Sequence, residues 1–336
     1  MTTFFLNRLA AEPHALAFAG QSTPWPVALA DQTTDPSLDE ALRGHVAAAG
    51  RLLTPVAADL LATTGRPVDL FGFAPNPARL GAAADATASV EGVALTQLGA
   101  LLDLEHLGYS VAQAKPLAVL GHSQGVLAVH MARAIEAAGS IEAAGKTLDE
   151  ILAVAALIGA AGTRRVRELG LNPKYGEASP MLSVKGATRE QVEALVARVN
   201  NARGPISIAV TNSDNHHVLS GYPEDLSAFA LEAEREHQHQ AKLREQKLHG
   251  GTVFNPTLEY LEVTLPFHSP LMADAVEQTV AWAGACGFDQ DRTRALAAEV
   301  LLNHVDWNAR VKALFNAADR PSCGSWTSAP ATRSAS

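Results

Sequence analysis

Along the first part of the chain, short apolar runs alternate with longer segments whose apolar residues recur at helical spacing. Residues 15–19 and 116–120 are apolar runs that each lead directly into a glycine, which is typical of a buried strand that ends in a loop. Helical spacing is found in residues 38–61, 90–107, 126–138 and 147–166, the last opened by a capping box from Thr147 to Glu150. Strands separated by helices predict an α/β domain with a parallel sheet.

The pattern changes near residue 179, where predicted strands and helices follow one another more closely. A strand, a helix, two strands, a helix and a strand are predicted at residues 181–184, 188–199, 206–211, 217–220, 223–248 and 258–265. This βαββαβ order is the ferredoxin-like pattern. We therefore expect a larger α/β domain, residues 1–178 and 266–316, interrupted by a small ferredoxin-like subdomain, residues 179–265.

The composition supports a packed structure. The 336 residues are 47% hydrophobic and 18% charged, so the chain has ample apolar material for a core and intrinsic disorder is excluded as its main state. At about 150 residues per domain, this length fits one large domain, two modest ones, or one domain that carries a smaller insertion.

Charge and cysteine content narrow the expected partners. The chain carries 26 basic and 35 acidic residues, and no basic block is long enough to bind a nucleic acid backbone. Two cysteines without metal-ligand spacing favour a reducing compartment and give no zinc site or disulfide framework. The N-terminus lacks the features of a signal peptide, and no apolar stretch reaches the roughly 18 residues that span a bilayer. We expect a cytoplasmic protein that binds neither membrane nor nucleic acid.

The segment Gly121-His122-Ser123-Gln124-Gly125 lies between the second apolar run and a helix. In this context Gly-x-Ser-x-Gly is a nucleophile elbow, because small residues on either side of the serine allow a sharp turn at the positive end of the following helix. The Ser123 hydroxyl is then exposed to a substrate, and the backbone N–H of Gln124 faces a developing oxyanion. Ser123 is therefore the candidate nucleophile.

A serine nucleophile needs a base at neutral pH, and histidine is the usual one. Most of the 12 histidines lie in polar contexts, and we expect residues 216–217 and 237–240 to lie on solvated faces and to bind no metal. His268 differs because Pro266 and Pro270 bracket it in a rigid, apolar turn just after the last strand of the small subdomain. His268 is the candidate base.

Four segments of the chain form a set that occurs, in this order, in one protein family. They are Phe18-Ala19-Gly20-Gln21, the elbow, Asn212 with Val218-Leu219-Ser220-Gly221, and residues 267–272. Together they resemble the malonyl/acetyl acyltransferase family that loads acyl carrier proteins. With Gln124 after the nucleophile and Asn303-His304-Val305-Asp306-Trp307 near the end, the chain is most similar to the N-terminal acetyltransferase domain of bacterial type I fatty acid synthases. The resemblance covers about residues 12–316.

The resemblance implies the fold and the roles of individual residues. The larger domain would be hydrolase-like, with a parallel sheet and the inserted ferredoxin-like subdomain. Ser123 would take the acyl group from coenzyme A, and His268, oriented by a main-chain carbonyl, would activate the phosphopantetheine thiol of the carrier. The backbone N–H groups of Gln21 and Gln124 would form the oxyanion hole, and Asn212 would line the acyl pocket.

The chain departs from the family pattern at the position that determines acyl specificity. Malonyl-using relatives carry an arginine there that pairs with the malonate carboxylate, and we align Ile158 with it. An apolar residue would leave that carboxylate unpaired, which predicts an acetyl or other short uncharged acyl group as substrate. The competing alignment places Arg164 or Arg165 there, and with Arg167 these residues are a candidate docking patch for an acidic carrier.

Two further departures concern the ends of the resemblance. Ser22 replaces the glycine that usually follows Gln21, which puts one oxyanion donor in question. Residues 317–336 show no periodicity, although the family has a strand there that reads Leu-Asp-Leu-Gly-Pro-Gly. Writing residues 326–332 in GC-rich codons and reading two bases on gives Asp-Leu-Gly-Pro-Gly-Asp. We expect a frameshifted end of a longer synthase, with a natural disordered tail as the alternative.

The function expected from the sequence is transfer of an acetyl group from acyl-CoA to an acyl carrier protein, through an acyl-Ser123 ester, within a type I fatty acid synthase. No cofactor or metal is expected, because acyl-CoA and the carrier are substrates. Two alternatives stay open. One is a serine esterase or thioesterase, with Asp214 or Asp225 as third member of a triad, and the other is an inactive truncated fragment.

Overall fold

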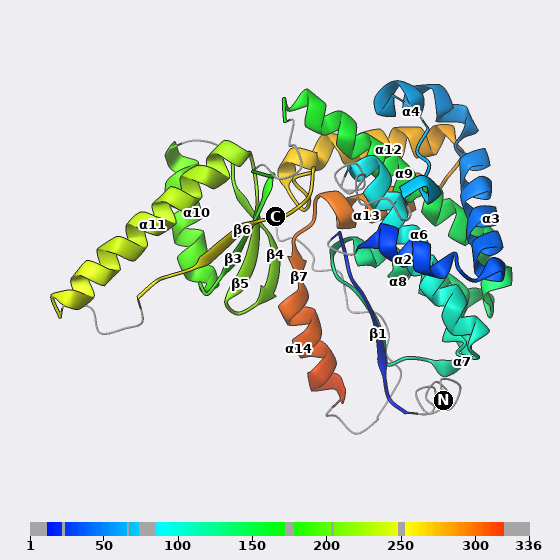
Figure 1. The fold of residues 1–336 in the computed structure, drawn as a ribbon, viewed down its shortest axis with the longest axis horizontal. Helices are drawn as coiled ribbons and strands as arrows, with labels where there is room; N and C mark the ends of the chain where they lie inside the picture. The colour runs from blue at the N-terminus through cyan, green and yellow to red at the C-terminus, as the bar shows by residue number, and fades with distance from the viewer. Residues whose placement is uncertain are drawn as a thin grey trace.

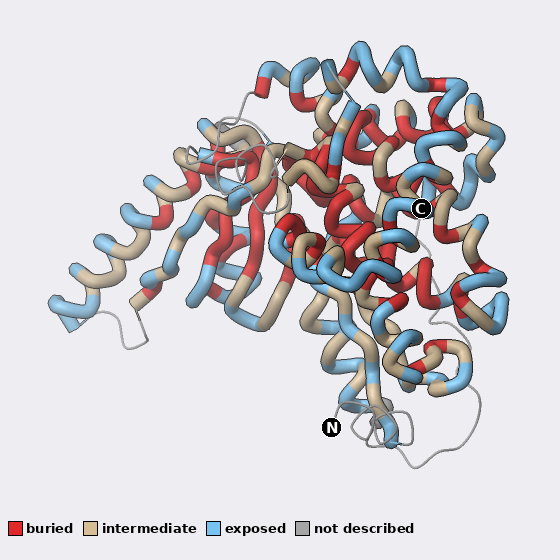
Figure 2. The backbone as a smooth tube through the Cα atoms, turned by 45° about the vertical axis from the view of Figure 1, so that its right-hand side comes forward, coloured by how far each residue is buried: buried red, intermediate tan, exposed pale blue. Residues whose placement is uncertain are grey.

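The computed structural model describes residues 12–21, 24–65, 67–73, 85–171, 178–202, 205–247 and 253–318. Helices and two sheets combine into a mixed α/β structure, so the predicted fold class is confirmed (Figure 1). Buried residues gather in the interior of a larger helical part and along the strands of a smaller part (Figure 2). The division at residues 178 and 265 stays a prediction.

The smaller sheet carries the elbow. Its two strands, β1 (Ala15–Phe18) and β2 (Ala118–Gly121), pair in parallel, with Phe18 opposite Gly121. Both were expected from the apolar runs at 15–19 and 116–120. Because parallel strands end at the same edge, the loop after Phe18 and the elbow after Gly121 emerge side by side.

Helices pack around this sheet and around a long central helix, α9 (Ile141–Glu168), most of whose residues are buried. α6, α8, α12 and α3 make the most extensive contacts with α9. The other helical segments of this part are α2 (Trp25–Gln32), α3 (Pro36–Leu52), η1 (Thr54–Val56), α4 (Ala57–Thr64), η2 (Phe71–Phe73), α6 (Ala86–His106), α7 (Val111–Ala114), η4 (Ser123–Gly125), α8 (Val126–Ala138), η5 (Pro270–Met272), α12 (Ala273–Ala285), α13 (Gln290–Leu301) and α14 (Trp307–Ala318).

Two helix predictions need correction. The helix expected over 38–61 is divided at residues 53–56, because Pro55 has no N–H to continue the ladder of helical hydrogen bonds. The capping box at Thr147 is wrong. α9 already begins at Ile141, since the Ser140 side chain accepts a hydrogen bond from the Ala143 N–H at 3.1 Å, and Thr147 lies within the helix.

The larger sheet has the strand order β6-β3-β5-β4-β7. β3 (Met181–Lys185), β4 (Ser207–Ser213), β5 (His216–Ser220) and β6 (Thr257–Tyr260) form its antiparallel part. With α10 (Arg189–Ala202) and α11 (Pro223–Glu245) they follow the predicted βαββαβ order. β6 is shorter than the expected 258–265, because its partner β3 begins at Met181.

A fifth strand, β7 (Val305–Asp306), joins this sheet from the C-terminal segment and runs parallel to β4. The sequence did not predict it. Figure 1 shows α10 and α11 covering the face of the sheet that lies away from the larger part, and β7 and α14 lying between the two parts. The opposite face of the sheet is therefore directed toward the elbow.

Among the described helices, none alone has the length and apolarity to cross a membrane. The segments Pro36–Leu52 and Thr54–Thr64, bent by 56° at their junction, meet the length and composition criteria only as a pair. Ser22 and residues 319–336, on which the sequence predicted a weakened oxyanion donor and a frameshifted tail, lie outside the described residues.

Candidate active site

Ser123 occupies a strained turn between β2 and α8. Its φ is +53°, a value that costs a non-glycine residue free energy and that clusters at functional sites. The turn closes so tightly that a Cβ atom on Gly121 would collide with the backbone of Gly125, and one on Gly125 would collide with the carbonyl oxygen of Phe18. These two glycines are therefore required where the sequence places them, and Ser123 is held at the end of β2.

The Ser123 hydroxyl and the His268 ring are in hydrogen-bond contact. Ser123 Oγ lies 2.7 Å from His268 Nε2, and His268 Nδ1 lies 2.8 Å from the main-chain oxygen of Asn303. A carbonyl oxygen only accepts, so Nδ1 carries the ring proton and Nε2 is left to accept the proton of Ser123. The structure thus brings together the predicted nucleophile and the predicted base in the protonation state that general-base catalysis needs.

The His268 loop is fixed by the end of α13. The Ser269 N–H donates to the carbonyl oxygen of Leu301 at 3.1 Å, two residues before Asn303, whose carbonyl oxygen accepts the hydrogen bond from His268 Nδ1. His268 itself has φ +55° and is 2% exposed. The partner of Nδ1 is a main-chain carbonyl, and neither Asp214 nor Asp225 takes that place. Asp214 binds Lys312 and Asn308 instead.

Burial lowers the pKa of His268 from its ordinary 6.5 to about 4, and the hydrogen bond to Asn303 opposes this shift only in part. The imidazole is therefore neutral, and able to accept a proton, throughout the physiological pH range. An ordinary histidine would already lose half of its basic form at pH 6.5.

We expect this shift to appear in the pH profile of serine acylation. The rate constant kcat/KM should stay near its maximum from pH 8 down to about pH 5 and fall only as pH approaches 4, since protonation of His268 removes the base. Assays of acyl-enzyme formation, quenched at fixed times at each pH, measure this dependence of kcat/KM on pH. A midpoint near pH 6.5 would contradict the burial argument.

Gln21 and Gln124 hold the two loops of the site together through their side chains. The Gln21 amide donates to the Gln124 side-chain oxygen, and the Gln124 amide donates in turn to the carbonyl oxygen of Val90 on α6. Gln97, also on α6, donates to the carbonyl oxygen of Ala19 at 2.6 Å. These contacts fix the main chain of both predicted oxyanion donors beside Ser123, and the Gln124 N–H lies in the first turn of a helix, where N–H groups lack helical partners.

Part of the chain is similar in sequence to known fatty acid synthases. A family model described as the fatty acid synthase central AT domain matches residues 180–260. The fatty acid synthase beta subunit TOXC of Cochliobolus carbonum is 29% identical over 163 residues, which are 44% of this chain and 8% of that protein. Fatty acid synthase 2 of Mycosarcoma maydis is 32% identical over 170 residues, or 47% of this chain and 4% of that protein. The chain spans less than a tenth of these curated relatives.

Solved structures resemble the chain over almost its whole length. The malonyl CoA-acyl carrier protein transacylase of Coxiella burnetii superposes with a TM-score of 0.60 at 16% identity, covering 91% of this chain and 84% of that one. The chain has the acyl carrier protein transacylase fold. An acyltransferase domain from the second module of the salinomycin polyketide synthase shares this fold, with a TM-score of 0.55 at 18% identity over 90% of this chain and 61% of that one.

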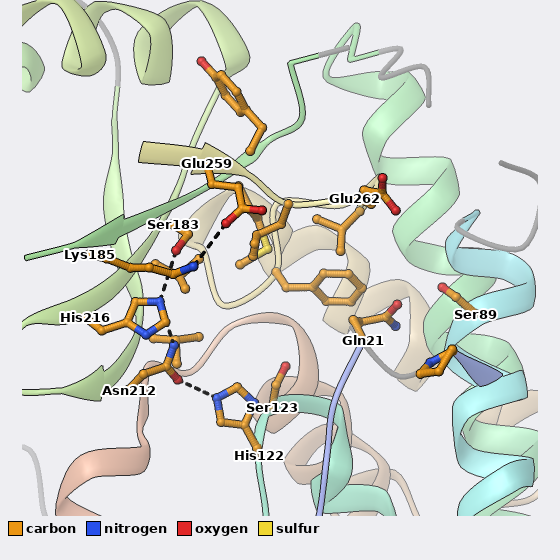
Figure 3. Close-up of a pocket in the computed structure, with 18 of the residues that line it drawn as sticks. Gln21, Ser89, His122, Ser123, Ser183, Lys185, Asn212, His216, Glu259 and Glu262 are labelled. Atoms are coloured by element: carbon orange, nitrogen blue, oxygen red, sulfur yellow. Dashed lines mark hydrogen bonds and ion pairs between the residues drawn. The ribbon is translucent and has the colours of Figure 1, made fainter. Parts of the chain in front are cut away.

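In this transacylase fold, a cavity of about 590 Å³ opens beside Ser123. Its walls come from both parts of the molecule, and such a volume accommodates a small-molecule ligand. Figure 3 shows Ser123, His122 and Gln21 on its floor, with the larger sheet on one side and α6 on the other. The described lining residues are Gln21, Pro24, Trp25, Pro26, Ser89, His122, Ser123, Met181, Ser183, Lys185, Val210, Asn212, His216, Val218, Glu259, Tyr260, Leu261, Glu262, Val263 and Phe267.

A chain of polar side chains runs from the sheet to the elbow (Figure 3). Asn212 lines the cavity, and its Oδ1 accepts from His122 Nε2 at 2.7 Å, while the Ser183 hydroxyl lies 3.1 Å from His216 Nε2. His122 also packs edge-on against Trp307. Asn212 thus orients the residue next to Ser123, and the sequence singled out neither His122 nor His216 for the site.

The prediction that His216 and His217 lie on a solvated face is wrong. His216 lines the cavity, and His217 is fully buried on the helix-covered face of the sheet, with no hydrogen-bond partner for either ring nitrogen among the described residues. Burial lowers the pKa of both rings, so both are neutral at physiological pH. Adjacent residues of a strand point to opposite faces of the sheet. His216 is therefore on the face that lines the cavity, and His217 is on the face that the helices cover.

Ile158 is not among the described residues that line the cavity. It is fully buried on α9, which packs against α6. Lys185 is the one cation in the described lining, and it pairs with Glu259 at 3.1 Å. The cavity therefore offers no unpaired described cation to an anionic acyl group.

The three arginines near the end of α9 make internal contacts. Arg164 binds Glu168 and Gln278, Arg165 binds Asp274 and the Leu271 carbonyl oxygen, and Arg167 donates to the carbonyl oxygen of Thr63. None of the three lines the cavity in the described residues. Within the same residues, no three His, Cys, Asp or Glu side chains form a group that could hold a metal ion.

Proposed function

We propose that the protein transfers an acetyl group from coenzyme A to the phosphopantetheine thiol of an acyl carrier protein, through an ester on Ser123. The observation that carries this proposal is the 2.7 Å contact between Ser123 Oγ and His268 Nε2 at a strand-to-helix elbow in a transacylase fold. Further support comes from the solved complex of a malonyl-transacylase with a holo acyl-carrier protein, whose transacylase fold covers 91% of this chain at a TM-score of 0.60 and 15% identity.

The first half-reaction loads the serine. His268 Nε2 takes the proton of the Ser123 hydroxyl as Oγ attacks the thioester carbonyl of acetyl-CoA. The tetrahedral oxyanion accepts hydrogen bonds from the backbone N–H groups of Gln124 and Gln21. When the C–S bond breaks, the proton passes from His268 to the sulfur, and free coenzyme A leaves behind acetyl-Ser123.

The second half-reaction reverses these roles. The carrier thiol gives its proton to His268 and attacks the ester carbonyl, the same N–H groups stabilise the oxyanion, and the proton returns to Ser123 Oγ as the C–O bond breaks. No cofactor takes part in either half. Hydrolysis differs only in that water replaces the thiol, and so the acceptor decides between a transferase and an esterase or thioesterase.

Radiolabelled acetyl-CoA, mixed with the protein and a holo carrier, separates these activities. Label on the carrier supports transfer, and free acetate as the sole labelled product would show a hydrolase. A folded protein that leaves all label on coenzyme A would indicate the third alternative, a fragment without activity.

The acetyl preference is the finer part of the proposal. An arginine is absent from the described cavity lining, and Lys185 is already paired with Glu259, so a malonate carboxylate would be desolvated without a partner. The curated relatives are fungal synthases, and a bacterial type I fatty acid synthase as the parent protein stays a prediction, as do its other domains as partners and a cytoplasmic location.

Ile158→Arg tests the alignment of Ile158 with the family arginine. Ile158 is fully buried and outside the described cavity lining, so the longer arginine side chain must extend into the cavity, where its guanidinium would pair with the malonate carboxylate in bidentate geometry and admit malonyl-CoA as a substrate. The gain should be about tenfold or more in the malonyl-to-acetyl ratio of transfer rates. Ile158→Met, of similar size but uncharged, is the matched control and should leave the ratio low. If thermal unfolding shows that the Ile158→Arg variant is folded and it still transfers no malonyl group, the alignment of Ile158 with the family arginine is wrong.

A further inference from the structure

Ser89 is a buried hydroxyl in the cavity wall that nothing in the proposed mechanism uses. It lies in the first turns of α6 and is 3% exposed. Its Oγ has no hydrogen-bond partner among the described residues, although it lines the cavity. A helical serine or threonine commonly satisfies its hydroxyl on a preceding carbonyl, as Thr96 of the same helix does on the carbonyl oxygen of Val93 at 2.9 Å. The hydroxyl of Ser89 is instead directed at the cavity.

Ser89 lies on the side of the cavity opposite the exposed ion pair of Lys185 and Glu259. On the side of the larger sheet, Lys185 and Glu259 have side chains that are 49% and 63% exposed, so the cavity opens to solvent there. On the side of α6, Trp25 is 2% exposed and packs against Gly92, one turn beyond Ser89. Figure 3 shows Ser89 across the cavity from Lys185 and His216, with Ser123 and Gln21 between them. A substrate that enters from the exposed side therefore passes Ser123 before it reaches Ser89.

We propose that Ser89 limits the length of the acyl group, by presenting an unpaired hydroxyl to the end of any apolar chain that extends past Ser123. This inference rests on the proposed acyl transfer. The Ser89 hydroxyl is itself buried in the cavity wall and has no partner there among the described residues. An acetyl group ends one carbon beyond the reacting carbonyl, so it extends least toward this hydroxyl. A butyryl or hexanoyl chain places apolar carbons against the hydroxyl and offers it no hydrogen bond, so it gains less from binding there than it would against an apolar wall.

The same geometry allows the opposite preference for polar chains. An acyl group that carries a hydroxyl near its end offers the Ser89 hydroxyl the hydrogen-bond partner that it lacks among the described residues. The proposal therefore concerns the chemistry of the chain end as well as its length, and Ser89 acts as a specificity-determining residue.

The test compares Ser89→Ala with the wild-type protein for formation of acyl-Ser123, using acetyl-CoA and butyryl-CoA in separate reactions. Removing the hydroxyl removes the penalty, so the butyryl-to-acetyl ratio of kcat/KM should rise about tenfold. Ser89→Thr keeps the hydroxyl and should keep the low ratio. Ser220→Ala is the matched control, because Ser220 is also a fully buried serine without a hydroxyl partner in the described residues but lies outside the described cavity lining.

The outcomes separate this proposal from the function on which it rests. A wild-type protein that acylates Ser123, together with a ratio in Ser89→Ala within about twofold of the wild type, would overturn the role of Ser89 alone. An equal rise in Ser220→Ala would overturn it as well, since the effect would then be general loosening. A folded wild-type protein that forms no acyl-Ser123 from either thioester would overturn both proposals together.

Discussion

Replacing Ser123 by alanine is expected to abolish acyl-enzyme formation and to lower acyl transfer by at least about a thousandfold, because no other group occupies the point of attack. His268→Ala should lower transfer by a similar factor, since Ser123 Oγ then has no acceptor for its proton. The two side chains act as a unit, so the double variant should be hardly worse than either single variant. Transfer rates to a holo carrier measure all three.

Ser37→Ala is the control for these variants, because Ser37 is exposed at the start of α3. It should transfer at the wild-type rate. Thermal melting should show that Ser123→Ala and His268→Ala remain folded. A folded Ser123→Ala variant with wild-type transfer would show that the elbow is not the nucleophile.

Replacing Gly125 by alanine is expected to destabilise the fold by about 3 kcal/mol or more, since the new Cβ would collide with the Phe18 carbonyl oxygen and only a shift of β1 away from the elbow could relieve it. The atoms that the new Cβ would meet belong to the main chain of Phe18 and Ala19, so no side-chain rotation relieves the collision. Denaturant unfolding gives the free energy, and the loss of β1 contact should also separate Gln21 from Gln124.

Gly145→Ala is the matched control for that substitution. Gly145 lies within α9, and a Cβ there meets no atom within 4 Å, so alanine should stabilise the helix by up to about 1 kcal/mol. If Gly125→Ala were as stable as Gly145→Ala, the close approach of β1 to the elbow would be wrong.

The elbow and the order of helices and strands were predictable because both depend on short stretches of neighbouring residues. Gly121, Ser123 and Gly125 encode a tight turn within five residues, and the βαββαβ order follows from short segments whose periodicity changes at clear breaks. The start of the helix expected at residues 188–199 is likewise local, since Thr188 and Gln191 exchange hydrogen bonds as a capping box.

The groups that complete the site were not predictable from the sequence. The partner of His268 is the carbonyl oxygen of Asn303, 35 residues away, and every residue has a carbonyl, so no residue type marks this position. β7 is too short to show a strand pattern and forms only because it adds to the edge of β4. The burial of His217 likewise depends on helices α10 and α11, which cover its face of the sheet.

The absence of Ile158 from the described cavity lining illustrates the same limit. Alignment with the family identifies the helix and the position along it that corresponds to the family arginine. Which side chains of that helix face the substrate depends on how α9 is rotated about its axis where it packs against α6. In the structure, the described α6 residue that lines the cavity is Ser89. The proposed acyl selectivity would thus involve two helices, and the sequence alone pointed to only one of them.

The measurement that tests the central claim most directly is mass spectrometry of the protein after brief mixing with acetyl-CoA, followed by addition of a holo carrier. The proposal predicts one acetyl group on the peptide that contains Ser123, its loss when the carrier is added, and its appearance on the carrier thiol. A folded protein whose Ser123 peptide stays unmodified, or whose acetyl group is released only as acetate in the presence of the carrier, would contradict it.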